Sequence, residues 1–374
     1  MSRSKNYCQS RRAFLGKSVA AVAAASFLPS AFSCAGSSEP TATPAAPEAG
    51  TGKVNSNFGG VQIGTITYSW RSMPGGLDNI IKYCQAANIS SIELMGNDLE
   101  TSLGAPQDPI MKFIQQMMAA PKPAPGKQPG GQPGGQPGAA APRQMTMPQF
   151  TPEQQAEIDK YKKDMKDWRL SLDLNKVEAA RKQLNDAGIT AHIVKMEPSR
   201  MSSDEEIDYA FKVAKLMGAK AVTDEMSLET AQKVAPFAEK NDMYLAFHNH
   251  MQYAQEGFSC DPVLAVSPSI MLNFDAGHFF GSTGIHPNEM IKKYHDRIYS
   301  MHIKDKTGPT TAGEPNTNQV WGQGEMPLED VLLLIKQEKW PIYCDIELEY
   351  DVKPWSNAVK EVATCVKYAR QILM

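Results

Sequence analysis

Four short apolar runs in the C-terminal part of the chain each end in a side chain that can bind a cation. The residues at these ends are His248, Asp275, His302 and Glu347, separated by 27, 27 and 45 positions. A barrel of eight parallel strands that alternate with helices uses roughly 30 residues for each strand and helix, and its active site lies where the strands end. The spacing therefore predicts an α/β fold, a (β/α)8 barrel, with a polar site at the C-terminal ends of its strands.

The rest of the chain supplies the remaining strands and helices of such a barrel. Short β-rich runs predict strands at 61–68, 91–96, 190–197, 220–225 and from residue 243, and periodic segments predict helices at 77–87, 151–187, 204–217, 228–241 and 356–373. Removing residues 102–150 from 61–374 leaves 265 residues, close to the ~250 that one barrel uses. We therefore expect a single barrel domain over residues 59–374.

The segment 102–150 interrupts this pattern directly after the second predicted strand. Its residues 120–150 are rich in Pro, Gly, Gln and Ala and repeat Gly-Gly-Gln-Pro. Low-complexity sequence of this kind is predicted to be disordered. Loops that follow barrel strands tolerate insertions, so we expect an inert insertion, with a lid over the site as the alternative.

Composition restricts the kinds of partner. The 374 residues are 42% hydrophobic and 21% charged, which is typical of a soluble globular protein. The net charge is −3 and no basic face is evident, which argues against nucleic-acid binding. The cysteines at 84, 260, 344 and 365 lack the CxxC spacing of a metal site and are predicted to be buried apolar residues rather than disulfides.

The N-terminus has the features of an export signal. Arg11 and Arg12 precede Phe14-Leu15 and an alanine-rich apolar run, a pattern that resembles a twin-arginine signal peptide. Gly16, Lys17 and Pro29 interrupt the run, which disfavours a membrane span. We predict that residues 1–33 are the signal peptide and that the protein is exported to the periplasm.

Two kinds of processing are open. Ala31-Phe-Ser33 resembles a small-x-small peptidase site, whereas Ser33-Cys34-Ala35 resembles a loose lipobox that would make Cys34 a lipidated membrane tether. Residues 34–58 are rich in Ser, Pro, Ala, Thr and Gly. That composition cannot form a core and predicts a flexible linker.

The residues at the predicted strand ends suit a metal ion. Imidazole nitrogen and carboxylate oxygen bind borderline divalent cations such as Zn, Mn, Co or Fe. Four of the seven histidines, at 248, 250, 278 and 302, lie in these ends. We predict that Asp275, His302 and Glu347 bind one divalent cation with His248 as a fourth ligand, the alternative for each histidine being a purely structural role.

Other residues near the strand ends are candidates for substrate contacts or proton transfer. The predicted substrate-binding residues are Trp70, Glu93, Asn249, His278, Lys304 and Asp305, and the predicted catalytic residues are Glu347, His250 and Glu349. Asn273 could orient a ligand. Glu197, Asp224 and Glu225 also lie near strand ends and belong either to the site lining or to a solvated rim.

These motifs resemble those of the xylose isomerase-like TIM barrels, the sugar phosphate isomerase/epimerase superfamily. The matching segments are Phe-His248-Asn-His250, Asn-Phe-Asp275-Ala-Gly-His278, Met-His302-Ile-Lys-Asp305 and Ile-Glu347-Leu-Glu349-Tyr350, with Gln323-Gly324 in the loop before the last unit. The resemblance extends over residues 59–374 apart from the insertion. It implies a xylose isomerase-like TIM barrel with one bound metal, which is Mn or Co in the ketose 3-epimerases of the superfamily.

The resemblance implies a metal-dependent sugar isomerase or epimerase that acts through a metal-stabilised enediolate. Those epimerases carry Glu at the position of His248, and epimerisation needs an acid/base group on each face of the carbon. The His-x-His form resembles inosose dehydratases and lyases of 3-keto-glycosides, so a lyase or dehydratase is the alternative, and a non-catalytic sugar-binding barrel is another. Predicted export favours an unphosphorylated sugar or glycoside as the partner.

Overall fold

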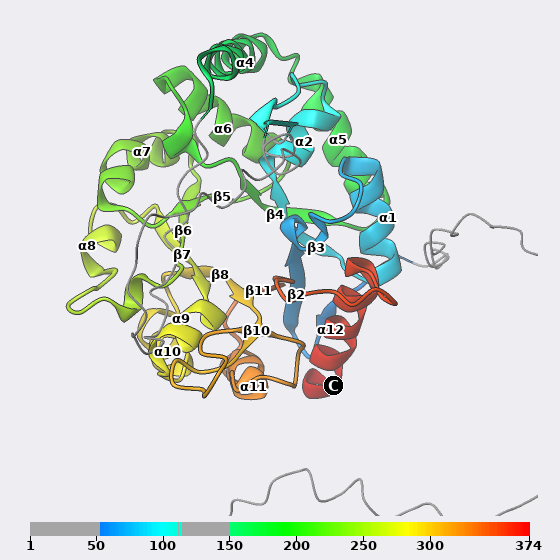
Figure 1. Cartoon of the computed structure of the whole chain (residues 1–374), viewed down its shortest axis with the longest axis vertical. Coiled ribbons are helices and arrows are strands. Elements are labelled where there is room, and N and C mark those ends of the chain that lie inside the picture. The colour runs from blue at the N-terminus through cyan, green and yellow to red at the C-terminus, as the bar shows by residue number, and fades with distance from the viewer. Residues whose placement is uncertain (1–52, 111, 114–149) are drawn as a thin grey trace, which may run out of the picture. The chain divides into compact units, whose positions relative to one another are not determined.

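The computed structural model describes residues 53–110, 112–113 and 150–374 (Figure 1). The predicted signal peptide, the lipidation at Cys34 and the linker up to residue 52 lie outside the described residues. The prediction of disorder for 120–150 also falls outside them, apart from Phe150.

Eight parallel strands form a closed barrel, as the sequence predicted. They are β2 (Val61–Ile66), β3 (Ser91–Met95), β4 (Thr190–Lys195), β5 (Ala221–Glu225), β6 (Tyr244–His248), β7 (Ile270–Asp275), β8 (Ile298–Ile303) and β11 (Tyr343–Ile346). Each strand pairs with the next, and β2 pairs with both β3 and β11, which closes the ring. The chain therefore has the (β/α)8 TIM barrel fold (Figure 1).

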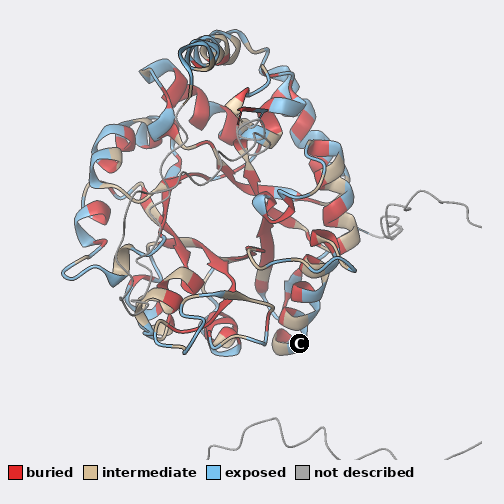
Figure 2. Cartoon of the chain, in the orientation of Figure 1, coloured by how far each residue is buried: buried red, intermediate tan, exposed pale blue. Residues whose placement is uncertain are grey.

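Helices surround the strands (Figure 1). They are α1 (Leu77–Ala87), α2 (Gly96–Ser102), α4 (Pro152–Ser171), α5 (Asn175–Asp186), α6 (Asp204–Leu216), α7 (Leu228–Asn241), α8 (Asp261–Leu264), α9 (Ala276–Thr283), α10 (Asn288–Tyr294), α11 (Leu328–Glu338) and α12 (Ala358–Leu373), with 3-10 turns η2 (Thr67–Trp70), η3 (Pro198–Arg200) and η4 (Gln252–Ala254). Figure 2 shows the strands almost entirely buried. Strands covered on both faces consist of near-continuous apolar residues, which is why they stand out in the sequence.

One predicted helix is two helices. The segment 151–187 was expected to be one continuous helix, but Leu172 has an extended backbone conformation (φ −62°, ψ 128°) that separates α4 from α5. Asp173 accepts a hydrogen bond from the backbone N–H of Asn175 at 3.1 Å. Asp side chains that bond the backbone in this way favour helix starts over helix interiors, so Asp173 favours the start of α5 two residues later, at Asn175.

The packed part of the chain reaches upstream of residue 59. Strand β1 (Asn57–Phe58) pairs antiparallel with the start of β2. Ser56 is buried and Phe58 joins the core. Ser56 also accepts a hydrogen bond from the N–H of Ser90, just before β3, at 2.9 Å. Residues 53–58 therefore attach to the barrel at the N-terminal ends of its strands.

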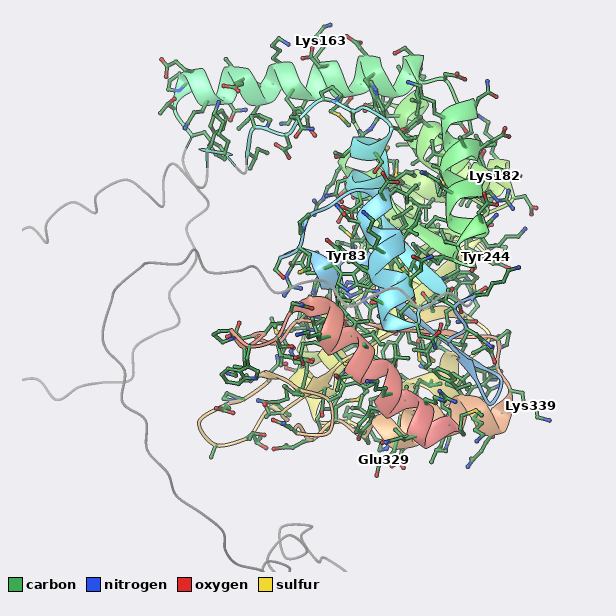
Figure 3. The ribbon with its side chains drawn as sticks, turned by 90° about the vertical axis from the view of Figure 1, so that its right-hand side faces the viewer. Tyr83, Lys163, Lys182, Tyr244, Glu329 and Lys339 are labelled. Atoms are coloured by element: carbon green, nitrogen blue, oxygen red, sulfur yellow. The ribbon has the colours of Figure 1, made fainter. Side chains whose placement is uncertain are left out.

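Helix α4 is tied to the barrel by a buried ion cluster. Arg169 donates to Glu100 on α2 at 2.8 and 3.0 Å and to Glu206 on α6 at 3.1 Å. Figure 3 shows Lys163 on the side of α4 that faces away from the rest of the chain. The side that carries Ile158 and Met165 is buried.

The cysteine prediction is confirmed for the described residues, where Cys84, Cys260, Cys344 and Cys365 are buried and free. None of the helices in the described ranges combines the length and the apolar character needed to cross a bilayer. The two short strands β9 (Asp305–Lys306) and β10 (Asn318–Gln319) pair with each other beside the barrel.

Candidate metal centre

The four predicted ligands come together at the C-terminal ends of four neighbouring strands. His248 and Asp275 end β6 and β7, His302 lies one residue before the end of β8, and Glu347 follows β11. Asp275 is the register partner of His302. One ligand atom from each of the four residues lies within 4.8 Å of all the others, and all four residues are buried. Two imidazoles and two carboxylates at this separation can hold one divalent cation.

The hydrogen bonds of Asp275 aim its second oxygen at the other ligands. Asp275 Oδ1 accepts from the backbone N–H of His278 at 2.7 Å and so caps α9. Asp275 Oδ2 lies 3.3 Å from His248 Nε2 and 3.9 Å from His302 Nδ1. An aspartate at a helix N-terminus is a common capping residue, so the local fold itself orients this carboxylate.

The ring of His302 is oriented by Glu93, which contacts its Nε2 atom. His302 Nε2 lies 2.7 Å from Glu93 Oε2, and Asn273 donates to the same oxygen at 2.8 Å. Burial of Glu93 opposes its ionisation, but His302 outweighs it and lowers the pKa of Glu93 to about 2. The ionised Glu93 must accept, so Nε2 carries a proton, and Nδ1 faces the carboxylate of Glu347, 3.1 Å away. Burial alone would lower the pKa of His302, but Glu347 and Glu93 raise it well above its ordinary value, so Nδ1 would have to release its proton to bind a metal. Such carboxylate–histidine pairs orient metal ligands.

Lys304 is a buried cation among the carboxylates. Its Nζ lies 2.8 Å from Asp275 Oδ2, 2.5 Å from Glu347 Oε2 and 2.7 Å from Glu349 Oε2. Burial alone would lower the pKa of Lys304, yet Asp275 and Glu347 raise it above its ordinary value. Lys304 therefore balances the charge of the oxygens that face the other metal-ligand candidates, and a divalent ion bound there would share Asp275 Oδ2 and Glu347 Oε2 with its ammonium group.

Two of the predicted substrate-binding residues have backbone partners. Asn249 exchanges hydrogen bonds with Asp275, accepting from its N–H at 3.0 Å and donating to its carbonyl at 3.2 Å. Asp305 accepts from the N–H groups of Gly322 and Gly324 at 2.8 and 2.9 Å. A Cβ at Gly324 would collide with Asp305. The hydrogen bonds of Asn249 hold the backbone of Asp275, a candidate metal ligand. The hydrogen bonds of Asp305 hold the loop after β10.

His250 and His278 lie at the edge of the centre. His278 Nε2 is 3.7 Å from both Asp275 Oδ2 and Glu349 Oε2, and burial lowers the pKa of His278 to about 4. His250 is about half exposed, and its Nε2 lies 3.0 Å from Glu225 Oε2. A neutral imidazole beside the carboxylates can accept or donate a proton.

Glu225 joins two of these histidines, a role that sequence reasoning did not assign to it. Its Oε2 lies 3.5 Å from His248 Nδ1 as well as 3.0 Å from His250 Nε2. The signal was present, because Glu225 ends β5 and is the register partner of His248. Glu225, His248 and His250 also form a second group of potential ligand atoms. Since Nε2 of His248 faces Asp275, its Nδ1 is free to donate to Glu225.

Trp70 lies apart from these groups. It ends η2, is 3% exposed and packs its ring against Tyr83 at 5.6 Å between centroids. Its indole N–H is buried and has no hydrogen-bond partner among the described residues.

Comparison with known families agrees with the fold and the motifs. The sequence profile of the xylose isomerase-like TIM barrel family matches residues 154–369, which is 216 of the 374 residues. The chain belongs to the xylose isomerase-like TIM barrel family. The match includes all four candidate metal ligands of the barrel.

Individual members of the family are distant from this chain. An inosose dehydratase of Clostridium botulinum (strain Eklund 17B / Type B) is 26% identical over 146 residues, 34% of this chain and 49% of that protein. The chain thus matches about half the length of this relative. A probable 3-DHS dehydratase from Bacillus anthracis (TM-score 0.50, 11% identity, 82% and 98% of the two chains) and a xylose isomerase domain protein from Alicyclobacillus acidocaldarius (0.51, 10%, 83% and 98%) share the fold.

Proposed function

We propose that this protein is a divalent-metal-dependent sugar isomerase or epimerase that removes a proton from the carbon beside the ketone of an unphosphorylated sugar or keto-sugar. The observation that carries the proposal is the buried group His248, Asp275, His302 and Glu347. A divalent ion held there would polarise a ketone and stabilise the negative charge that develops on its oxygen. Mn, Zn, Co and Fe all suit this donor set.

Glu347 is the candidate base. Burial raises the pKa of a carboxyl group, but Lys304 and His302 outweigh it and lower the pKa of Glu347 well below its usual range. The group is therefore ionised at neutral pH and can accept a proton. Lys304 also touches Glu349, so it links the base to a second carboxylate that could return the proton.

A lyase or dehydratase is the second candidate, and His248 is the observation that favours it. With His at this position, the ligand group has two carboxylates, of which Asp275 caps a helix. That leaves Glu347 as the ligand best placed to act as base. An epimerase that uses two bases needs one base on each face of the substrate carbon. On an elimination path His250 or Glu349 would take the proton and the group on the next carbon would leave with its electron pair. The relative named an inosose dehydratase is consistent with this path.

Hydrogen exchange tests the shared first step. Protein loaded with Mn, Zn, Co or Fe is incubated in deuterated water with fructose and with a 3-keto-glucoside, and NMR follows the C–H signals beside the ketone. We expect exchange that a chelator abolishes. A rearranged sugar indicates isomerisation or epimerisation, and release of the aglycone indicates elimination. Full metal occupancy without exchange on any keto-sugar would leave the non-catalytic sugar-binding barrel as the better explanation.

We also propose export by the twin-arginine route, supported by Arg11 and Arg12 ahead of the apolar run. Changing both residues to Lys should keep the protein inside the cell, because the export machinery recognises the pair. Normal export of that variant would exclude the route. Cys34→Ala tests lipidation separately, because it should release a membrane-bound protein into the soluble fraction.

A further inference from the structure

A large cavity lies beside the metal centre, at the ends of the first three barrel strands. It has a volume of about 900 Å³ and is bordered by η2, α1, α2, α4 and the residues that follow β3 and β4. Pockets for drug-sized ligands span roughly 300–1,000 Å³. The cavity is thus at the upper end of that range. It offers more space than the metal centre needs for the sugar ring of the reaction proposed above.

The lining is rich in aromatic and methionine side chains. It includes Trp70, Tyr83, Met73, Met165, Met196 and Met201. Flexible thioethers pack well against flat rings. The buried indole N–H of Trp70, which lacks a partner among the described residues, is a donor that an oxygen on a bound ligand could satisfy.

The buried cations of the wall are already neutralised. Arg169 contacts Glu100 and Glu206, and Lys195 lies 3.1 Å from Glu225 and 3.9 Å from Glu197. A phosphate or carboxylate on the ligand would have to compete with these acidic partners. The buried part of the wall therefore favours an uncharged group, whereas the exposed Arg71, which also lines the cavity, donates only to the backbone carbonyls of Tyr68 and Leu348 among the described residues.

Lys195 connects the cavity to the metal centre. It lines the cavity, and Glu225, which it contacts at 3.1 Å, lies 3.5 Å from His248. The cavity wall is thus two contacts away from a candidate metal ligand. A ligand that reaches from the metal centre into the cavity would have its polar end at the carboxylates and its apolar end among the methionines.

We propose that this cavity binds the aglycone of the substrate, and that the substrate class is uncharged keto-glycosides of flat, aromatic alcohols rather than free monosaccharides. The inference rests on the proposed function for the sugar end, because the metal centre is what binds the ketone-bearing ring. It adds that the sugar end of the substrate is recognised at the ends of β6, β7, β8 and β11, and the aglycone end at the ends of β2, β3 and β4.

Equilibrium binding to two simple probes tests this directly. Calorimetry compares 4-nitrophenyl glucoside with methyl glucoside, which differ only in the aglycone, with and without added Mn. We expect the aryl probe to bind about tenfold tighter or more, because its ring leaves water. Equal affinities of the wild-type protein for the two probes would overturn the proposal without the need for any variant.

A variant that partly fills the cavity tests whether the aryl group of the probe binds there. Met73→Trp places a ring in the lining and should reduce the advantage of the aryl probe to about twofold or less. Leu170→Trp, at a 49% exposed position of α4 that does not line the cavity, should retain the advantage. Thermal unfolding checks that both variants fold. An aryl preference that survives in a folded Met73→Trp protein would show that the ring binds elsewhere.

The two proposals fail in different ways. Proton exchange on free keto-sugars without any aryl preference would refute the aglycone site and leave the reaction standing. Aryl preference lost in Met73→Trp, with no exchange on any keto-sugar in the metal-loaded protein, would keep the cavity as an aryl site and refute the reaction.

Discussion

The two arcs of the barrel mouth are built from the same kind of strand but end in opposite chemistry. The metal arc, formed by the ends of β6, β7, β8 and β11, presents His248, Asp275, His302 and Glu347, all buried and within contact of one another. The cavity arc, formed by the ends of β2, β3 and β4, borders about 900 Å³ of space lined by aromatic and methionine residues together with paired charged residues such as Arg169 and Glu100. Function at a barrel mouth depends on which residues end each strand, and here one arc groups candidate metal ligands while the other borders a cavity with aromatic and methionine side chains.

The two arcs also differ in how their buried charged side chains are paired. On the metal arc the buried Lys304 faces three carboxylates at once. On the cavity arc Arg169 is shared by two carboxylates and lies between helices. The first cluster contacts the candidate metal ligands Asp275 and Glu347, whereas the second fixes the helix that borders the cavity. We therefore expect metal binding and cavity integrity to respond to different substitutions.

The largest effect should come from removing a metal ligand. Asp275→Ala and His302→Ala should each lower metal affinity by more than the about 10–100-fold typical of an outer-shell change and should abolish C–H exchange. Metal analysis after dialysis and NMR exchange measure both. His286→Ala, at a histidine paired with Asp330 away from the centre, is the control. Full metal content and normal turnover in both ligand variants would place the site elsewhere.

The next effect is on folding stability. Arg169→Met leaves Glu100 and Glu206 buried without their partner, so we expect a loss of about 3–5 kcal/mol in the free energy of unfolding. Arg200→Met, at a side chain that is 71% exposed, should cost no more than about 1 kcal/mol. Denaturant titrations measure both. If Arg169→Met instead left stability unchanged, α4 would not be anchored by this cluster.

A smaller effect on the metal should follow from Glu93→Gln. The amide keeps the shape of the side chain but weakens the acceptor that holds the Nε2 proton of His302, and metal affinity should fall about 10–100-fold. Glu197→Gln on the cavity arc is the matched control and should leave affinity unchanged. A comparable loss in the control would mean that the two arcs are coupled.

The smallest effect on occupancy is expected for His248→Glu. This change restores the Glu, Asp, His, Glu group of the ketose 3-epimerases, and metal affinity should stay within about tenfold of the wild type. What should change is the product, toward epimerisation and away from elimination. NMR of the reaction mixture distinguishes these products, and an unchanged product ratio would show that His248 does not decide between the two reactions.

The sequence predicted the metal arc better than the cavity arc for a physical reason. Each candidate ligand ends an apolar run, and strand ends in a parallel barrel meet at one face, so His248, Asp275 and His302 could be grouped from spacing alone. The helices 77–87 and 228–241 were also predicted to the residue, because their apolar positions recur with helical period.

The cavity arc depends on contacts that spacing does not reveal. Its lining comes from η2, α2 and α4, which are separated by the low-complexity segment. The break at Asp173 and the ion cluster of Arg169 decide where α4 lies, and both are side-chain interactions. Glu225 was predicted only to lie near a strand end, because its contacts with His248 and His250 follow from the register of β5 and β6.

The short pairing of β1 with β2 decides from which side the chain enters the barrel. Asn57 and Phe58 pair with the start of β2, and Ser56 bonds Ser90 at the start of β3. Residues 56–58 therefore lie on the face opposite the metal arc and the cavity arc. Substitutions in residues 53–58 can thus alter the packing of the fold without touching the residues at the C-terminal strand ends.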